Sequence, residues 1–89
     1  MDAETVKNKL MSFFLRNYSY IADEIEEDES LIEKGYIDSL GIIGLILYIE
    51  HNFNIKVKDS EIVPENFDSI INIIAYINKK ADYSAGNGR

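Results

Sequence analysis

A serine preceded by an aspartate is the pair of residues in this chain with the clearest chemical potential. Asp38 and Ser39 stand directly before a strongly apolar stretch that begins at Leu40. A serine hydroxyl can act as a nucleophile when a base lies beside it. The only histidine, His51, is predicted on the polar side of the following helix, with no serine at helical spacing, so the sequence shows no catalytic triad. Taken alone, the Asp38–Ser39 pair is therefore typical of a helix N-cap.

A run of acidic residues is the second candidate site. Residues 23–29 place six carboxylates in seven positions, which suggests a calcium loop. An EF-hand needs oxygen ligands at alternating positions and a glycine at the sixth. Counted from Asp23, the alternating positions include Ile25 and Leu31, and the sixth is Asp28, so the pattern fails. We interpret the run as a solvated, self-repelling loop that binds divalent ions only weakly, if at all.

Composition and charge exclude several classes of function. The chain has 89 residues, a formal net charge of −7 and no cysteine. Its length predicts one domain, and its charge disfavours binding to nucleic acid or to anionic lipid. Without cysteine there is no disulfide, thiolate metal site or cysteine nucleophile. The start lacks the features of a signal peptide, and the longest apolar run, residues 40–49, is too short to span a bilayer. We expect a small, acidic, cytoplasmic protein that does not insert into membranes.

Helical periodicity dominates the first half of the chain. The spacing of apolar residues predicts a helix from Ala3 to about Asn17. Residues 18–38 then form an unusually long connection, a feature that is often functional in so small a domain. Gly35 is the expected site of a positive-φ turn within it. Four apolar residues of this connection are expected to anchor it to the bundle: Ile21, Ile25, Leu31 and Ile37.

The next helix, from Asp38–Ser39 to Phe53, carries two apolar stripes. The wider stripe is predicted to face the core, and its members are Ile42, Leu45, Ile46, Ile49 and Phe53. A second stripe lies well away from it and consists of Leu40, Ile43 and Leu47. A domain of this size can hardly bury both stripes, so we predict that the second stripe is kept for a partner protein.

The remainder of the chain predicts a connector, a short helix and a long helix. Ile55 and Val57 are expected to be buried in an extended connector. Residues 59–62 suit one helical turn, capped by Asp59 and ended by Pro64. The last helix is expected to start within residues 66–68 and to end near Ala81, with Lys79 and Lys80 at its negative C-terminal end. Its inward residues are predicted to be Phe67, Ile70, Ile71, Ile74 and Ile77.

These elements together predict an all-α fold. The expected architecture is a four-helix bundle, with three main helices, one short helix and a long loop between the first two helices. Residues 1–82 form the domain, and residues 83–89 are predicted to be a disordered C-terminal tail because they are small, polar and rich in glycine.

The wider sequence around Ser39 carries a family resemblance. Residues 30–40, Ser-Leu-Ile-Glu-Lys-Gly-Tyr-Ile-Asp-Ser-Leu, resemble the attachment segment of acyl and peptidyl carrier proteins, in which a glycine turn leads into Asp-Ser-Leu at the start of the second helix. The other elements follow in the order of that family, including residues 66–70, Asn-Phe-Asp-Ser-Ile, at the last helix. The resemblance covers about residues 4 to 80.

The resemblance implies a covalent carrier rather than an enzyme. In this family a phosphopantetheinyl transferase, with magnesium on its own side, moves 4′-phosphopantetheine from coenzyme A onto the serine. Ser39 would be the attachment residue and Asp38 the matching residue before it. A phosphodiester there would lie at a helix N-terminus, where the N–H groups and the dipole favour negative charge. Acyl or aminoacyl groups would then be carried as thioesters between a loading ligase or synthase and other enzymes. A monomer is the expected state of such a shuttle.

The resemblance also gives the second stripe a role, because in this family residues just after the serine contact the processing enzymes. The chain departs from the fatty-acid type, which has carboxylates along this helix where this chain has Gly41, Gly44 and His51. In this respect the chain looks more like stand-alone carriers loaded by adenylating ligases, such as D-alanyl carriers. We hypothesise that the two glycines let a partner backbone approach closely.

Two other functions compete with the carrier interpretation. The chain would be an acidic protein-interaction module without a prosthetic group if Ser39 never receives the arm. A small hydrolase with Ser39 as its nucleophile is disfavoured, because the sequence offers neither a base nor a pocket large enough to exclude water.

Overall fold

The computed structural model describes residues 2–87, with side chains described as far as residue 81. All regular structure within these residues is helical. The helices are α1 (Ala3–Asn17), α2 (Ser39–Phe53), α3 (Pro64–Phe67) and α4 (Ile70–Asn87), and single 3₁₀ turns occur at η1 (Ala22–Glu24) and η2 (Asp59–Glu61). The predicted all-α bundle of three main helices and one short helix is confirmed. No helix among the described residues has the length and apolar character that crossing a membrane requires.

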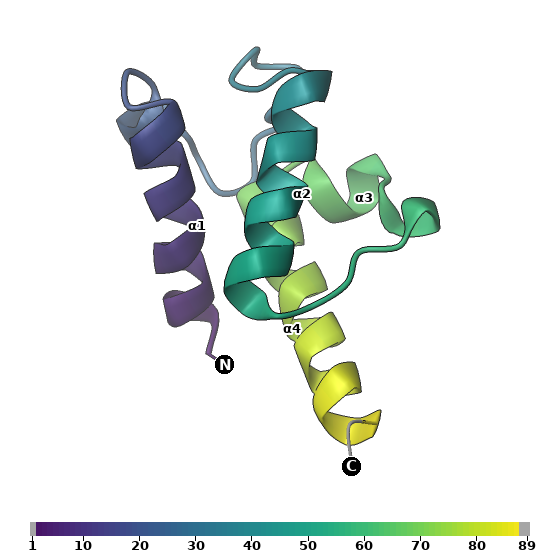
Figure 1. Cartoon of the computed structure of the whole chain (residues 1–89). Coiled ribbons are helices and arrows are strands. Elements are labelled where there is room, and N and C mark those ends of the chain that lie inside the picture. The colour runs from purple at the N-terminus through teal and green to yellow at the C-terminus, as the bar shows by residue number, and fades with distance from the viewer. Residues whose placement is uncertain (1, 88–89) are drawn as a thin grey trace.

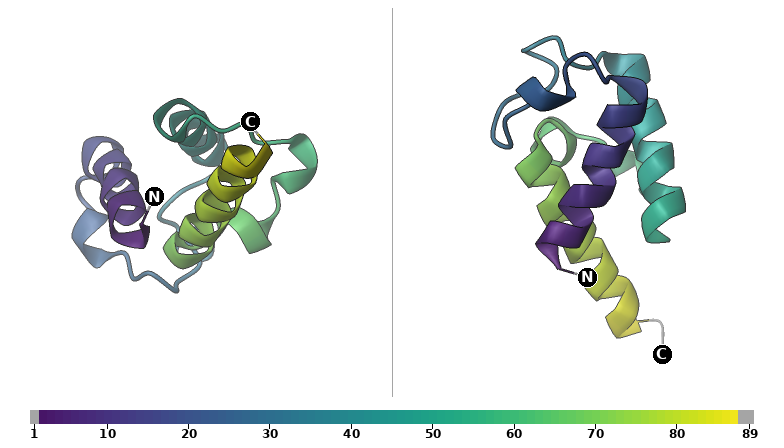
Figure 2. Two further views of the ribbon diagram at one scale, coloured as in Figure 1. Left: turned by 90° about the horizontal axis from the view of Figure 1, so that it is seen from below. Right: turned by 90° about the vertical axis from the view of Figure 1, so that its left-hand side faces the viewer.

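The three long helices form the body of the bundle. Figure 1 shows α1 beside α2, with α4 running behind and below α2 and α3 packed against the start of α4. The views from below and from the side show the long connection crossing one end of the bundle, from the end of α1 to the start of α2 (Figure 2). The first residue of α2 therefore lies at the same end of the molecule as the last turn of α1.

The end of each of the first two helices is defined by local chemistry. The Asp2 carboxylate accepts a hydrogen bond from the Thr5 N–H at 2.7 Å, which caps α1. At the end of α2, Asn54 adopts the left-handed conformation with φ 54°, which asparagine tolerates better than most residues. The connector that follows buries Ile55 and Val57, as predicted.

The long connection is held down by apolar anchors, as the sequence predicts. Leu31 and Ile37 are buried, while Ile21 and Ile25 are half-buried. Gly35 has φ 74°, so the predicted positive-φ turn is confirmed. The turn reverses the chain between the two buried anchors and thereby directs it towards the start of α2.

Asp68, between α3 and α4, joins this connection to the junction of those two helices. Its carboxylate accepts hydrogen bonds from the Ser30 hydroxyl at 2.6 Å and from the Ile32 N–H at 3.2 Å. Its backbone carbonyl accepts a third from the Leu31 N–H at 2.7 Å. Hydrogen bonds to a charged acceptor are stronger than neutral ones. Asp68 thus fixes the stretch that leads into the Gly35 turn.

The predicted boundaries of the short helical turns are wrong. Asp59 does not cap η2; instead the Glu61 carboxylate turns back and accepts the Lys58 N–H at 2.9 Å. Pro64 does not end a helix but begins α3. Proline suits a first helical position because its φ is already helical and the N–H that it lacks would have no partner there.

The predicted start and inward face of the last helix also need correction. α4 begins at Ile70, after a break that separates it from α3, and the Ser69 hydroxyl accepts the Asn72 N–H at 3.2 Å. Ile71 is 52% exposed, whereas Ile73 and Tyr76 are buried. Counted from Ile70, Ile71 lies about 100° around the helix axis and so falls outside the core stripe. Phe67, Ile70, Ile74 and Ile77 are buried as predicted.

The end of α4 differs from the prediction as well. The helix continues to Asn87, beyond the end predicted near Ala81, so Lys79 and Lys80 do not lie in its last turn. The Lys80 ammonium instead forms an ion pair with Glu61 at 3.0 Å. The tail predicted for residues 83–89 remains a prediction, because its side chains and all of residues 88–89 lie outside the described part of the chain.

Candidate functional site

Ser39 is the first residue of α2 and its side chain is exposed. Asp38 precedes it with an extended backbone and acts as the N-cap: its carboxylate accepts the Gly41 N–H at 2.8 Å. The sequence predicted this helix start correctly, and the structure assigns the capping role to Asp38 rather than to Ser39. The serine hydroxyl therefore projects at the N-terminal end of a helix without serving as its cap.

The two glycines of α2 have different surroundings. A Cβ added to Gly41 would lie 2.5 Å from Ile37 Cγ1 and against the Tyr18 hydroxyl, distances that real Cβ atoms essentially never show. A Cβ on Gly44 would meet nothing within 4 Å. Gly41 thus lets the end of α1 and the long connection pack against the first turn of α2. The hypothesis that both glycines serve a partner is therefore corrected for Gly41 and stays a prediction for Gly44.

An open pocket of about 390 Å³ lies beside Ser39, and we call it the Ser39 pocket. It is lined by Tyr18, Tyr20, Ile32, Gly35, Tyr36, Ile37, Asp38 and Ser39. Partial burial and the nearby Asp38 carboxylate raise the pKa of Tyr18 above its usual value. Burial and Glu29 raise the pKa of Tyr36, whose hydroxyl donates to the Glu24 carbonyl and the Glu29 carboxylate, each at 3.3 Å. Both phenols are therefore neutral at physiological pH.

Sequence reasoning missed the three tyrosines of this pocket. Tyr18, Tyr20 and Tyr36 are far from Ser39 in sequence or lie in an irregular connection, so no periodicity relates them. The sequence did contain one signal: two of these tyrosines directly follow the first helix, and the third directly follows the glycine turn that leads to Ser39.

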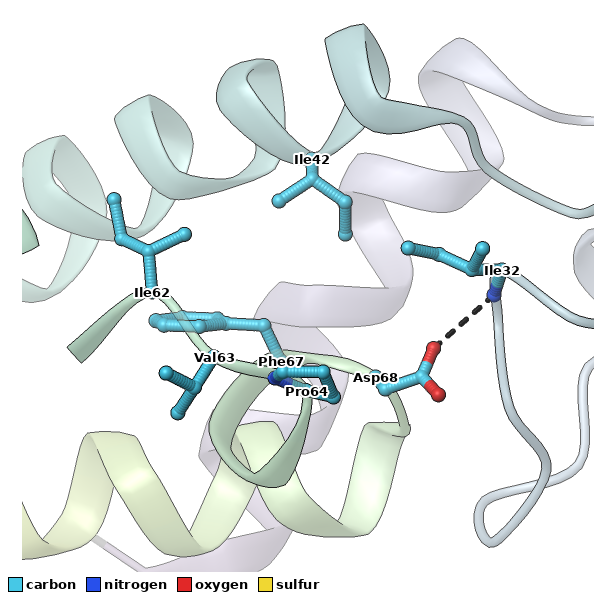
Figure 3. A pocket seen from close by; sticks show the side chains of 7 residues that line it. All are labelled: Ile32, Ile42, Ile62, Val63, Pro64, Phe67 and Asp68. Atoms are coloured by element: carbon cyan, nitrogen blue, oxygen red, sulfur yellow. Dashed lines mark hydrogen bonds between the residues drawn. The ribbon is translucent and has the colours of Figure 1, made fainter. Parts of the chain in front are cut away.

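A second, smaller pocket lies between α2 and α3. It measures about 140 Å³ and is lined mainly by apolar side chains, here called the α2–α3 pocket: Ile32, Ile42, Ile62, Val63, Pro64, Phe67 and Asp68. Figure 3 shows Ile42 and Ile32 on one side of it and the residues of the α3 segment on the other, with the Asp68–Ile32 hydrogen bond drawn as a dashed line. Ile32 lines both this pocket and the Ser39 pocket.

The two stripes predicted on α2 are separated as expected. All five residues of the wider stripe are buried: Ile42, Leu45, Ile46, Ile49 and Phe53. In the second stripe, the exposed fraction is 82% for Leu40, 50% for Ile43 and 60% for Leu47. The second stripe is thus an apolar surface that begins next to Ser39; its use by a partner is still a prediction.

The other sequence candidates do not form a site. No group of three or more acidic or histidine residues that could hold a metal ion occurs in the described part of the chain. Within the acidic run, Glu27 pairs with Lys7 at 3.0 Å, and Glu29 pairs with Lys34 at 3.1 Å. The hydrogen bond from Lys34, followed by that from the Glu26 N–H, holds the pKa of Glu29 below its usual range. His51 is exposed.

The start of α2 fits a phosphate-linked group on Ser39. The side chain is exposed, so a bulky group can be attached without displacing the core. Among the N–H groups of the first turn, that of Gly41 already donates to the Asp38 carboxylate. The helix dipole still favours negative charge at this end of α2. Ser39 would hold the group, and Asp38 would keep the helix end in place beneath it.

Comparison with known proteins agrees with this geometry. A family model described as a phosphopantetheine attachment site matches residues 14–77. An acyl carrier protein of Akkermansia muciniphila is 30% identical over 79 residues, which cover 89% of this chain and 96% of the relative. A D-alanyl carrier protein of Streptococcus uberis is 36% identical over 79% of this chain and 87% of its own length, and one of Streptococcus suis is 33% identical over 81% and 85%. With its all-helical fold and a serine at the start of α2, the chain belongs to the family of phosphopantetheine-bearing acyl carrier proteins.

Proposed function

We propose that Ser39 is the residue to which the 4′-phosphopantetheine of this carrier is attached. The observation that carries this assignment is the exposed hydroxyl of Ser39 at the first position of α2, directly after the Asp38 cap and inside the matched region. As a member of the family, the chain carries acyl or aminoacyl groups and is not itself an enzyme. The attached arm supplies the thiol on which these groups travel as thioesters.

The attachment reaction needs no catalytic residue from this chain beyond the Ser39 hydroxyl. The Ser39 oxygen forms a bond to the phosphorus of coenzyme A that bears the pantetheine, the pyrophosphate bond breaks, and adenosine 3′,5′-bisphosphate leaves. The serine proton goes to a base on the transferase, since His51 lies near the opposite end of α2. Asp38 holds the helix end, and Asp68 with the Gly35 turn positions the segment that leads to it.

The cargo that the structure favours is small. Two of the relatives are named D-alanyl carrier proteins. The α2–α3 pocket measures about 140 Å³, whereas an engineered apolar cavity of about 150 Å³ holds one benzene molecule. Such a pocket holds a short acyl or aminoacyl group but not a long acyl chain. We therefore propose an aminoacyl or short acyl cargo, loaded by an adenylating ligase.

We further propose that the second stripe of α2 is the surface on which the transferase and the ligase dock. Leu40, Ile43 and Leu47 present exposed apolar side chains beginning next to the attachment residue. A working monomer and a cytoplasmic location complete the proposal, because a shuttle must present Ser39 and this stripe to several enzymes in turn.

Intact mass spectrometry tests the assignment of Ser39. The wild type, Ser39→Ala and the control Ser60→Ala, which removes another exposed serine hydroxyl in η2, are incubated with coenzyme A, magnesium and a broad-specificity phosphopantetheinyl transferase. We expect the wild type and Ser60→Ala to gain one phosphopantetheine and Ser39→Ala to gain none. Because the cap is Asp38, Ser39→Ala should change stability by no more than about 0.5 kcal/mol.

A gain of mass by Ser39→Ala would contradict the assignment. No gain by a folded wild type would leave the α2 start as a plain helix cap and favour an acidic protein-interaction module.

A further inference from the structure

The Ser39 pocket is assembled around the proposed attachment residue by three parts of the chain. Tyr18 and Tyr20 come from the first residues after α1, Ile32 and the Gly35–Ile37 turn from the later part of the long connection, and Asp38 and Ser39 from the start of α2. At about 390 Å³ it falls within the size range of pockets that bind small molecules. A group bonded to the Ser39 oxygen would start in the wall of this pocket.

The inner walls of the pocket are fixed by contacts that do not depend on a ligand. The Tyr18 hydroxyl lies against Gly41 in the first turn of α2, where any side chain would displace it. Tyr36 is held by hydrogen bonds to Glu24 and Glu29. The Tyr36 and Ile37 N–H groups both donate to the Leu31 carbonyl, at 2.9 and 3.3 Å. The pocket is therefore formed before any arm is attached.

Tyr20 differs from Tyr36 because its side chain forms no hydrogen bond with the part of the chain that the structure describes. Its side chain is 78% exposed, although tyrosine is a large, partly apolar residue. A lining residue that is so exposed belongs to the outer part of the pocket, where covering a bound group would remove apolar surface from water. An exposed ring at the rim of a formed pocket suits the role of an outer wall.

We propose that the Ser39 pocket holds the pantetheine part of the arm against the end of α1 and the long connection, with Tyr20 as its outer wall. This inference rests on the proposed attachment at Ser39. A pantetheine chain combines two amides with a geminal dimethyl group. The pocket offers apolar contacts from Ile32, Ile37 and the tyrosine rings, and the Tyr20 hydroxyl, which can donate to or accept from an amide.

The α2–α3 pocket is the competing location, and the geometry disfavours it for the arm. Ser39 does not line it, and Ile32 stands between the two pockets as a shared wall. It has less than half the volume, and Asp68 is its only charged lining residue, already engaged by Ser30 and Ile32. It is therefore suited to the tip of the arm or its cargo rather than to the two amides.

Isotope-filtered nuclear Overhauser measurements on the holo protein test the proposal. The arm is introduced from coenzyme A labelled with ¹³C and ¹⁵N in its pantetheine, on unlabelled protein, and complete loading is confirmed by intact mass. We expect cross-peaks from the geminal methyl protons to the ring protons of Tyr20 and Tyr36. Heteronuclear relaxation of the arm amides should show that they tumble with the protein.

Two variants distinguish a specific effect of Tyr20 on the arm from a general effect of losing an exposed side chain. Tyr20→Ser should weaken the remaining cross-peaks to the Tyr36 ring and make the arm amides more mobile. The control Ile71→Ser removes another exposed large side chain, on α4 and outside the pocket, and should change neither.

Two results would overturn the proposal while leaving Ser39 as the attachment residue. One is a set of cross-peaks to Ile62 and Val63 instead, and the other is arm amides as mobile in the wild type as in free pantetheine. If the arm is never attached to Ser39, the mass measurement shows this first, and both proposals fail together.

Discussion

At the scale of single residues, Gly41 and Gly44 show how one residue type serves two purposes within one helix. Glycine in a helix interior costs roughly 0.5–1 kcal/mol relative to alanine, so each glycine is retained against that cost. Around Gly41 the structure has no room for a side chain, while Gly44 faces open space. The first is explained by packing within the domain and the second is not.

Replacing each glycine by alanine should change stability in opposite directions. We expect Gly41→Ala to destabilise the domain by about 1–3 kcal/mol, because its Cβ must displace Ile37 or Tyr18. Gly44→Ala should stabilise it by roughly 0.5–1 kcal/mol. Urea unfolding of both variants measures the two changes. Equal stability of Gly41→Ala and the wild type would mean that the long connection moves aside easily.

Loading rates of the same Gly44→Ala variant test the remaining part of the partner hypothesis. If the ligase loads Gly44→Ala as fast as the wild type while its stability rises, Gly44 is not kept for close approach by a partner.

Glu61 predicts a pH dependence of stability. Burial would raise its pKa, but hydrogen bonds from the Lys58 N–H, Lys80 and Tyr76 outweigh burial and hold the pKa below its usual value. In the pH range between the folded and unfolded pKa values, the unfolded chain binds the proton and the folded chain does not, so stability falls as the pH falls. We expect this contribution to be fully present above the unfolded pKa and to be lost as the pH falls through the lowered folded pKa.

Glu61→Gln should remove that part of the acid dependence. Chemical unfolding at a series of pH values below 6 measures the slope for the wild type and the variant. An unchanged slope in Glu61→Gln would assign the acid dependence to other carboxylates, such as Glu29, whose pKa is also lowered.

At the scale of elements, α2 is the helix whose two apolar faces have different tasks. The wider stripe is buried, whereas Leu40, Ile43 and Leu47 stay exposed. Exposed apolar patches on small proteins commonly mark interaction surfaces. The proposed docking surface is therefore separable from the core by mutation.

A charge on this face should affect loading but not folding. We expect Leu47→Glu to lower the rate of phosphopantetheine transfer or of ligase loading, with a melting temperature close to that of the wild type. The matched control is Ile71→Glu, at a similarly exposed isoleucine on α4, which should leave both rates unchanged. If Leu47→Glu unfolds the domain, the second stripe belongs to the core.

Elements were predictable where local sequence decides the structure. The positive-φ turn at Gly35, the start of α2 at Asp38–Ser39 and the two stripes of α2 follow from residue type and helical period. Pro64 was misplaced because proline suits a helix start as well as it stops one. Ile71 was assigned to the core because the break between α3 and α4 was not recognised, which shifted the counted face.

Contacts between distant segments were beyond the reach of local patterns. The hydrogen bonds of Asp68 to Ser30 and Ile32 join residues that are more than thirty positions apart, and no periodicity links them. The Ser39 pocket likewise exists only once the end of α1 meets the start of α2. The sequence could name the proposed attachment residue but not the walls beside it.

At the scale of the whole molecule, the packed interior limits the cargo. The core of the bundle is filled by isoleucine, leucine and phenylalanine side chains, and the α2–α3 pocket holds about 140 Å³. Closely packed interiors do not open for added methylene groups without strain. A long acyl chain would therefore remain outside the bundle.

Holo protein loaded with acyl groups of increasing length tests this limit. Each buried methylene group would add about 0.8 kcal/mol, so a sheltered chain would raise the melting temperature step by step. We expect the butanoyl and tetradecanoyl forms to melt at nearly the same temperature, and the longer form to bind more strongly to a hydrophobic column. A stepwise rise would show that the helices part to admit the chain.

The bond network of Asp68 also has a consequence for the order of events in the cell. Ser30, the Gly35 turn and Ser39 leave the ribosome well before Asp68. Until Asp68 follows, the segment around the proposed attachment residue lacks the hydrogen bonds that Ser30 and Ile32 form with the Asp68 carboxylate. The Asp68 carboxylate can bind that segment only after the junction of α3 and α4 has been synthesised. We expect the transferase to need the surface that forms at that point. We therefore expect phosphopantetheine to be attached only after synthesis has passed Asp68. A chain truncated before Asp68 contains the whole Asp-Ser-Leu motif, yet it should not be modified.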